Sequence, residues 1–236
     1  MKIAIIAPTK FLSAFCTTDC QLCYAHLVLE DEVYRGFYLE RSRLGDVVIL
    51  DSSFQIPRRA LDFSALMQAI NLVKPTYVVL PDVDFSCEKT VEKSLSIVGS
   101  IPTKTIGNLQ GVVLDDLRRC YKNLKGSCSM IGLPLSNEKV LKREWIIKRL
   151  RISQDCFYLG TYRDPIEELP IDSNVLGIST DFPFRLGYDL RKLSEYYPEP
   201  PQIDFNANDI PIPELVEGNI EHFLELCKEA TEDAWL

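Results

Sequence analysis

Short apolar runs alternate along the chain with stretches whose apolar positions repeat at helical spacing. Runs that are hydrophobic throughout are typical of strands buried on both faces of a parallel sheet. The predicted strands are Ile3–Ala7, Asp46–Leu50, Tyr77–Leu80, Thr105–Gln110, Cys128–Leu133, Cys156–Leu159 and Val175–Ile178. The predicted helices are Ala60–Val73, Ser86–Val98, Leu114–Leu124 and Glu138–Leu150, with Pro75, Pro102, Pro134 and Pro165 at boundaries between elements.

This alternation predicts an α/β fold, a (β/α)8-type TIM barrel that is compact or incomplete, because about 250 residues are usual for that fold. An open doubly wound sheet is the alternative. No G-x-G-x-x-G or G-x-x-x-x-G-K-[ST] motif supports a dinucleotide or P-loop site. We expect residues 1–195 to form the barrel and residues 196–236 a Pro-rich linker and an acidic C-terminal helix. That helix should pack on the barrel through Phe223, Leu224 and Trp235.

The composition indicates a soluble globular protein, since 46% of the 236 residues are hydrophobic and 25% are charged. No apolar run reaches the roughly 18–20 residues that a membrane span needs. The net charge of −8 at first argues against a nucleic-acid partner. However, residues 195–236 hold eleven acidic residues and one basic residue, Lys228, so the rest of the chain is slightly basic. The charge distribution therefore does not exclude a nucleic-acid partner.

Polar or glycine residues directly follow most of the predicted strands. In a barrel, the carboxyl ends of the strands converge at one mouth, where active sites are built. Asp51, Asp82 and Gln110 end three successive predicted strands, which is more than helix capping requires, whereas Ser136 and Asp84 are expected to cap helices. The other residues at the strand ends are Ser52, Phe54, Gln55, Gly111, Gly132, Leu159, Gly160, Ser179 and Asp181.

Six segments follow one another in a fixed order: ILDSSFQ, VVLPDV, LQG, IGLPL, YLGTYRDPIEEL and GISTDFPFRLG. They resemble, in the same order, conserved segments of the tRNA-guanine transglycosylase superfamily, beginning with T-D-S-G-G-F-Q and including V-Q-G, G-G-L and Y-L-M-G-x-G-x-P-E-D-L. The last segment resembles the one around the nucleophile, F-D-x-x-x-P. The small size and the AHLVLEDEVYRGFY stretch look closest to the phage-type DNA-guanine transglycosylases.

The resemblance implies a pentosyltransferase that exchanges guanine in nucleic acid, DNA more than tRNA, for a 7-deazaguanine base. An aspartate attacks C1′, guanine leaves, and the new base takes its place on the covalent intermediate. Carboxylates suit this chemistry because the transition state at C1′ is cation-like, and the base must first be unstacked. The 7-deazaguanine is a co-substrate, and no other cofactor is implied. The expected compartment is the cytoplasm, or the host cytoplasm for a phage enzyme.

The resemblance also assigns roles to individual residues. Asp51 matches the general acid/base, while Asp82 and Gln110 match the side chains that read the guanine edge. Phe54 matches the aromatic residue that stacks on the base, in the same motif as Ser52 and Gln55. The pocket walls are implied to be Gly111, Gly132 and the backbone of Leu159 and Gly160.

The sequence departs from the family pattern in three places. The run DSSFQ is one residue shorter than D-S-G-G-F-Q and lacks both glycines. The nucleophile position, four residues before Pro183, holds Ser179, and Asp181 follows two residues later, on the same side of an extended strand. The nucleophile is therefore Asp181 or Ser179, or it is missing, and the barrel then binds a base or nucleic acid without exchange. The C-x-C-x-x-C…H zinc motif of many members is absent.

The chain has eight cysteines, and Cys16, Cys20 and Cys23 have C-x3-C-x2-C spacing. This spacing resembles that of radical S-adenosylmethionine enzymes, in which three thiolates hold a [4Fe–4S] cluster. A zinc site would need a fourth ligand, for which Cys87 or Asp19 is available. The alternative, which we favour, is reduced thiols in a loop and at the start of a helix, because a reducing compartment is expected. The cysteines at 120, 128, 156 and 227 are expected to be inert core residues.

Two predicted helices are rich in basic residues. In the helix over residues 138–150, we expect Trp145, Ile146 and Leu150 to face the barrel. Lys139, Lys142, Arg143 and Arg149 would then face outward, next to a second basic helix with Arg118, Arg119, Lys122 and Lys125. Such a face would contact phosphates, or would simply be solvated. The acidic C-terminal helix could fold over it as a mimic of nucleic-acid phosphates.

Overall fold

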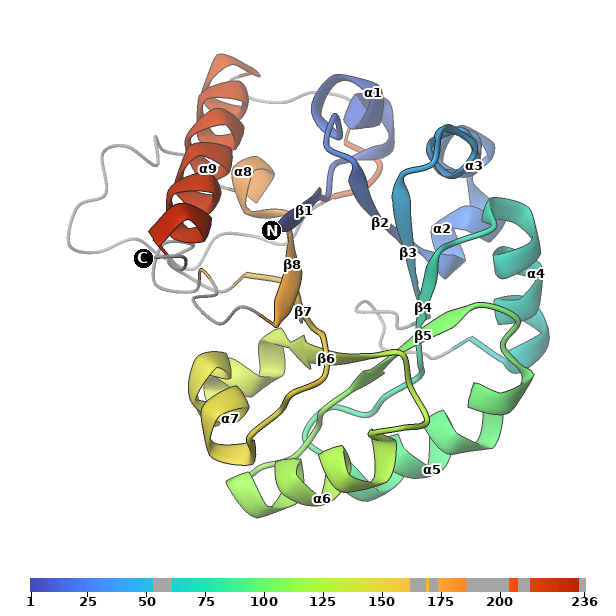
Figure 1. Cartoon of the computed structure of the whole chain (residues 1–236). Helices are drawn as coiled ribbons and strands as arrows, with labels where there is room; N and C mark the ends of the chain where they lie inside the picture. The colour runs from blue at the N-terminus through green and yellow to red at the C-terminus, as the bar shows by residue number, and fades with distance from the viewer. Residues whose placement is uncertain (53–60, 162–168, 170–173, 186–203, 208–212, 234–236) are drawn as a thin grey trace.

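The predicted barrel is confirmed by a computed structural model of the chain, which describes residues 1–52, 61–161, 169, 174–185, 204–207 and 213–233. Eight parallel strands form one sheet in the order β1-β8-β7-β6-β5-β4-β3-β2, with helices around its outside (Figure 1). The two edge strands, β1 and β2, lie side by side, and Lys2 forms an ion pair with Asp19 at this seam. The ring is therefore nearly closed. The strands are β1 (Lys2–Ile5), β2 (Cys20–Tyr24), β3 (Val47–Asp51), β4 (Tyr77–Val79), β5 (Lys104–Asn108), β6 (Met130–Pro134), β7 (Cys156–Leu159) and β8 (Val175–Thr180).

The helices lie between the strands in sequence and outside them in space (Figure 1). Local signals set several of their ends: Asp31 caps α3 by accepting hydrogen bonds from two backbone N–H groups, and Gly45 ends it with a φ of 93°. The helices are α1 (Leu12–Phe15), α2 (Ala25–Glu30), α3 (Glu32–Leu44), α4 (Phe63–Val73), α5 (Cys87–Ile97), α6 (Leu114–Leu124), α7 (Arg143–Leu150), α8 (Phe182–Arg185) and α9 (Pro213–Asp233). Short 3-10 turns are η1 (Thr9–Phe11), η2 (Val98–Ser100) and η3 (Leu135–Lys139). None of the helices in the described part of the chain combines the length and the apolar character that crossing a membrane requires.

The strand β2 was not predicted, because its sequence contains a glutamine and two cysteines. The expectation of a loop and a helix start at Cys20 and Cys23 is wrong. The polar Gln21 fits in a buried strand because its Nε2 donates hydrogen bonds to the carbonyl oxygens of Cys16 and Thr18. The helix predicted over residues 138–150 is also shorter than expected, since α7 begins at Arg143, after the η3 turn.

Alternation along the strands divides the core into two layers. Even-numbered β2 residues such as Cys20 and Leu22 lie inside the barrel, whereas Cys23 lies in the layer between strands and helices. The interior layer is apolar along most of the barrel axis. It contains Ala4, Ile6, Cys20, Leu22, Ile49, Val79, Ile106, Met130, Phe157 and Leu159.

The acidic C-terminal helix is part of this architecture. Helix α9 packs beside α8, and Val216, Ile220, Phe223 and Cys227 are buried in the outer layer of the core. Phe223 is buried and Leu224 half-buried, as predicted, while Trp235 lies outside the described residues. The acidic residues of α9 therefore belong to a helix whose apolar face anchors it on the barrel.

Candidate active site

Polar side chains gather at one rim of the barrel, formed by the carboxyl ends of the parallel strands; we call this rim the mouth. Asp51 is the last residue of β3 and lies in register between Tyr24 of β2 and Val79 of β4. Asp82 follows β4, and Asp181 follows β8. The structure thus brings the three predicted carboxylates to the same end of the barrel.

Two buried amides hold the carboxylate of Asp82. Its Oδ2 accepts a hydrogen bond from Gln110 Nε2 at 2.6 Å and another from Asn108 Nδ2 at 3.1 Å. Gln110 is completely buried, and Asn108 is 3% exposed. We call these three residues the β4–β5 sector. Sequence analysis missed Asn108; the available signal was its position two residues before Gln110, on the same face of the strand predicted over Thr105–Gln110.

The hydrogen-bonding capacity of Gln110 is filled by the protein itself. Its Oε1 accepts the backbone N–H of Phe85 at 3.0 Å and the hydroxyl of Ser136 at 3.1 Å, and its Nε2 also reaches Asp84 at 3.4 Å. The prediction that Ser136 and Asp84 cap helices is wrong, because both side chains face Gln110 and the N-cap position of α5 is Ser86. Phe85 has a φ of 60°, a strained conformation of the kind that clusters at functional sites.

The predicted pocket wall at Gly132 is occupied by a neighbouring side chain. A Cβ atom built on Gly132 would lie 2.0 Å from Asn108 Oδ1, so only glycine leaves room for the amide there. Asn108 Oδ1 is buried and has no hydrogen-bond partner among the described residues. Gly111 packs closely against a helix, because a Cβ there would meet Asp116 of α6 at 2.5 Å. Its lack of a side chain allows the chain to pass close to that helix.

Arg143 lies inside the protein, and the prediction that it faces outward is wrong. The residue is 1% exposed, and its guanidinium pairs with Glu138 at 3.0 Å and lies 4.4 Å from the centre of the Tyr158 ring. It also donates to the carbonyl oxygens of Leu133 at 3.3 Å and Gly160 at 2.8 Å. Because these carbonyls belong to the ends of β6 and β7, Arg143 ties two strand ends together; we call this arrangement the arginine clamp.

The clamp extends to β8 through Gly160. The backbone N–H of Gly160 donates to Ser179 Oγ at 3.0 Å, and Gly160 has a φ of 83°, which favours glycine. Ser179 is 1% exposed, whereas Asp181 is half-buried and directly precedes α8. Leu159 lies in the apolar interior just below this point. Of the two predicted nucleophiles, Asp181 is thus the more accessible.

Part of the predicted DSSFQ segment can be placed. The side chain of Ser52 is buried, and its Oγ has no hydrogen-bond partner among the described residues. Phe54 and Gln55 lie outside the described part of the chain. Aromatic rings are nevertheless present at the mouth. Tyr24 packs edge-on against Phe205, with the ring centres 5.3 Å apart, and the ring centre of His26 lies 6.0 Å from that of Tyr24. These rings were not predicted as site residues, because β2 was not recognised as a strand.

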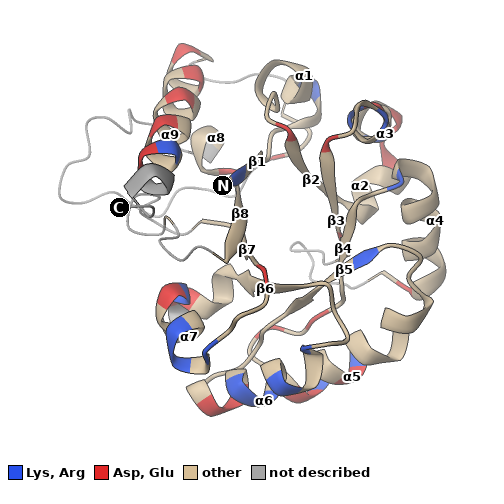
Figure 2. Ribbon diagram, in the orientation of Figure 1, with Lys and Arg blue, Asp and Glu red and all other residues tan. Residues whose placement is uncertain are grey.

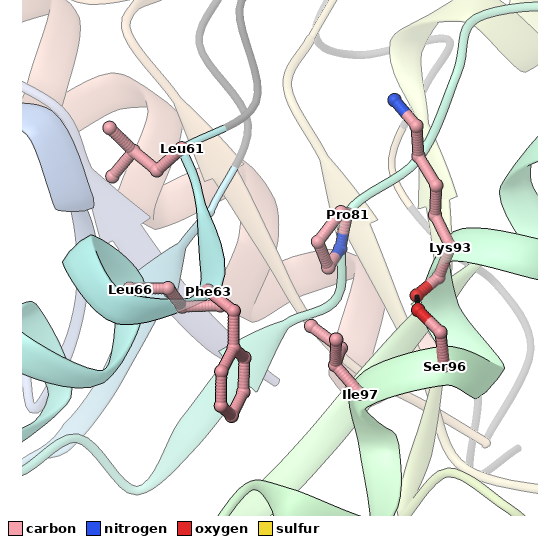
Figure 3. Close-up of a pocket in the computed structure, with 7 residues that line it drawn as sticks. All are labelled: Leu61, Phe63, Leu66, Pro81, Lys93, Ser96 and Ile97. Atoms are coloured by element: carbon pink, nitrogen blue, oxygen red, sulfur yellow. Dashed lines mark hydrogen bonds between the residues drawn. The ribbon is translucent and has the colours of Figure 1, made fainter.

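A cavity of about 260 Å³ lies outside the barrel wall, between α4 and α5 (Figure 3). Phe63 and Leu66 of α4 face Ile97 of α5 across it, and Pro81 lines it directly before Asp82. The cavity therefore adjoins the β4–β5 sector without containing its polar atoms. Its remaining lining residues are Leu61, Lys93 and Ser96.

The three clustered cysteines do not converge. Cys20 lies inside the barrel, while Cys16 and Cys23 lie in the outer layer, because an odd separation on a strand puts side chains on opposite faces. Burial raises the pKa of Cys16 and of Cys20 to about 12. No cluster of three or more potential metal ligands occurs among the described residues. This conformation therefore gives no common centre for three thiolates.

The predicted basic face is only partly present. Arg118 and Arg119 are exposed on α6, but they form ion pairs with Asp115 and Asp116 on the same helix. Lys142, the residue directly before α7, is exposed, whereas the side chain of Lys139 is not among those that the structure describes. Trp145, predicted to face the barrel, is 49% exposed and lies under Arg149, since Arg143 takes the inward position.

Figure 2 shows basic and acidic residues mixed on α6 and α7, which lie next to each other. The acidic helix α9 packs against α8 instead of covering this surface (Figure 2). The expectation that it folds over the basic face is therefore wrong. The physical reason is the buried apolar face of α9, which fixes the helix on the barrel wall.

Comparison with known proteins finds no family model that matches the chain and no matching curated protein. The transglycosylase resemblance therefore rests on the sequence segments and on where their residues lie in the barrel.

Proposed function

We propose that the protein is a guanine transglycosylase-like enzyme that exchanges guanine in nucleic acid, in DNA rather than in tRNA, for a 7-deazaguanine base. The observation that carries the proposal is the convergence of Asp51, Asp82 and Asp181 at the mouth, in the chain order of the transglycosylase segments. Carboxylates at a barrel mouth suit a reaction whose transition state carries positive charge at C1′.

In the proposed reaction, the Asp181 carboxylate attacks C1′ of the guanosine. The bond between C1′ and the base nitrogen breaks, and the electron pair leaves with guanine, which is protonated by Asp51. A 7-deazaguanine then gives its ring N–H proton to Asp51 and attacks C1′, which releases Asp181. We assign the nucleophile to Asp181 because the Ser179 hydroxyl is buried and accepts a hydrogen bond from Gly160.

The nucleic acid would approach the mouth with the target base unstacked from its neighbours. Tyr24 and Phe205 supply aromatic surface beside Asp51, on which a flipped base can stack. Arg118, Arg119 and Lys142 are exposed, and phosphate contacts through them would make affinity fall with salt concentration. Arg118 and Arg119 would then exchange their ion pairs with Asp115 and Asp116 for phosphates.

Incorporation of a labelled 7-deazaguanine into guanine-containing DNA and into tRNA tests the proposal, with purified protein and each polymer in parallel. Asp51→Asn should lower the exchange rate by about 10²–10⁴-fold, the range for loss of a general acid/base. Asp31→Asn is the matched control, because asparagine caps a helix as well as aspartate does and Asp31 lies at the start of α3.

A covalent adduct between protein and nucleic acid, trapped by denaturation, should map to Asp181 and should persist in Ser179→Ala. An adduct on Ser179 would instead identify Ser179 as the nucleophile. Base binding by the wild-type protein without exchange into either polymer would contradict the proposed enzymatic activity. It would favour the alternative, a barrel that binds a base without catalysing exchange.

A further inference from the structure

The two amides that hold Asp82 differ in what they leave available. Gln110 uses Oε1 for two protein donors and Nε2 for two carboxylates, so its four hydrogen-bonding sites are filled. Asn108 uses only Nδ2 in this network, and its Oδ1 is buried without a partner among the described residues. The sector therefore holds one saturated amide and one amide with an open acceptor.

Asp82 fixes which atom of Asn108 remains open. An ionised carboxylate only accepts hydrogen bonds, so the Asn108 NH2 group must face Asp82. The carbonyl oxygen then points away from Asp82, across the inner face of β6 at Gly132. Turning the amide over would place two acceptors against each other and would leave the NH2 group beside a glycine.

An unpaired buried carbonyl destabilises the folded protein, because the loss of its hydrogen bonds to water is not compensated. Native proteins contain few such groups, and each one calls for an explanation, such as a ligand that completes it. A ligand that completes Asn108 Oδ1 must bring an N–H donor, because the group is purely an acceptor. The neighbouring Asp82 carboxylate favours the same kind of ligand edge.

We propose that Asn108 reads the donor edge of the base, and that Gln110 is a positioning residue that holds Asp82 and the Phe85 turn in place. This inference rests on the proposed function and reverses the roles that the transglycosylase resemblance implies for position 110. The group recognised by Asn108 is an exocyclic amine of the kind that guanine and 2-amino-7-deazapurines share. Hypoxanthine lacks this amine and keeps the ring N–H.

The test measures the affinities of guanine and hypoxanthine by calorimetry, for the full-length protein and its variants. Wild-type protein should prefer guanine. Asn108→Leu, which has a similar volume, should reduce this preference by about tenfold, the equivalent of 1.4 kcal/mol. Gln110→Leu should weaken both bases alike and keep the preference, because Asp82 then loses its support.

Asn137→Leu is the matched control, since Asn137 is equally buried, has an unpartnered Oδ1 among the described residues, and donates to the carbonyl of Leu109 on the outer side of the sheet. It should keep both affinities. If Asn108→Leu does not fold, Asn108→Ala removes the same acceptor with less bulk and should give the same loss of preference. An unchanged preference in the folded Asn108 variant, or a preference lost only in Gln110→Leu, would overturn the inference and leave the proposed function standing. A wild-type protein that binds neither base would overturn both.

Discussion

In the β4–β5 sector, Asp82 is held by two buried amides, one of which keeps an unpaired oxygen. On the adjacent strands β6 and β7, the arginine clamp uses its donors for Glu138 and for the carbonyls of Leu133 and Gly160, next to the ring of Tyr158. Both arrangements contain buried polar side chains, and both join strand ends at the mouth. The clamp satisfies backbone acceptors, whereas the sector leaves an acceptor open.

This difference indicates that the clamp is a structural element and that the sector is the candidate binding site. A saturated, charge-assisted network fixes the shape of the rim and has nothing left to offer a ligand. A network with an open acceptor is less stable alone and gains when a donor binds. The two regions should therefore respond in opposite ways to substitution: loss of stability in the clamp, loss of selectivity in the sector.

The largest effect on stability is expected from Arg143→Leu. Removal of one partner of a buried ion pair costs about 3–5 kcal/mol, because Glu138 is left uncompensated and two carbonyls lose their donor. Denaturant unfolding measures the change, and Arg118→Leu, at an exposed arginine of α6, should stay within about 0.5 kcal/mol. A loss below about 1 kcal/mol in Arg143→Leu would show that the clamp is not a stabilising element.

A smaller effect on stability, joined to an effect on binding, is expected from Gly132→Ala. The new methyl group must displace the Asn108 amide, and such overpacking costs about 1–3 kcal/mol. The guanine preference should fall as it does in Asn108→Leu. In Gly36→Ala, the control, the methyl group meets no atom within 4 Å, and the change should stabilise α3 slightly. Normal base selectivity in a folded Gly132→Ala protein would contradict the position assigned to Asn108.

Acidification should act on the mouth through His26, whose ring lies beside Tyr24. Burial lowers the pKa of His26 to about 4, whereas the unfolded chain has a histidine pKa near 6.5. Between these values the unfolded state binds more protons, so the free energy of unfolding should fall as the pH drops from about 6.5 to 4. Denaturant unfolding across this range should show a shallower slope for His26→Gln. An identical slope would mean that His26 does not titrate in this way.

Much of the fold could be predicted because apolar runs bury both faces of parallel strands. All seven predicted strands are present, and α6 has the predicted limits. The missing strand, β2, carries Gln21, whose burial depends on carbonyls of the preceding turn that no local pattern reveals. Trp145 was expected to be buried and Arg143 exposed, because aromatic residues are normally buried more often than arginines. The structure shows the reverse, since Arg143 finds enough hydrogen-bond acceptors inside the protein.

The sequence by itself determined that strand-end carboxylates meet at one mouth, since parallel strands in a barrel all point the same way. Only the tertiary structure decided what each polar group does there. Asn108 and Gln110 are chemically alike and two positions apart, yet their partners come from 26 and 28 residues away in the chain. Hydrogen bonds over such distances depend on packing and register, and these leave Gln110 saturated and Asn108 with an open oxygen.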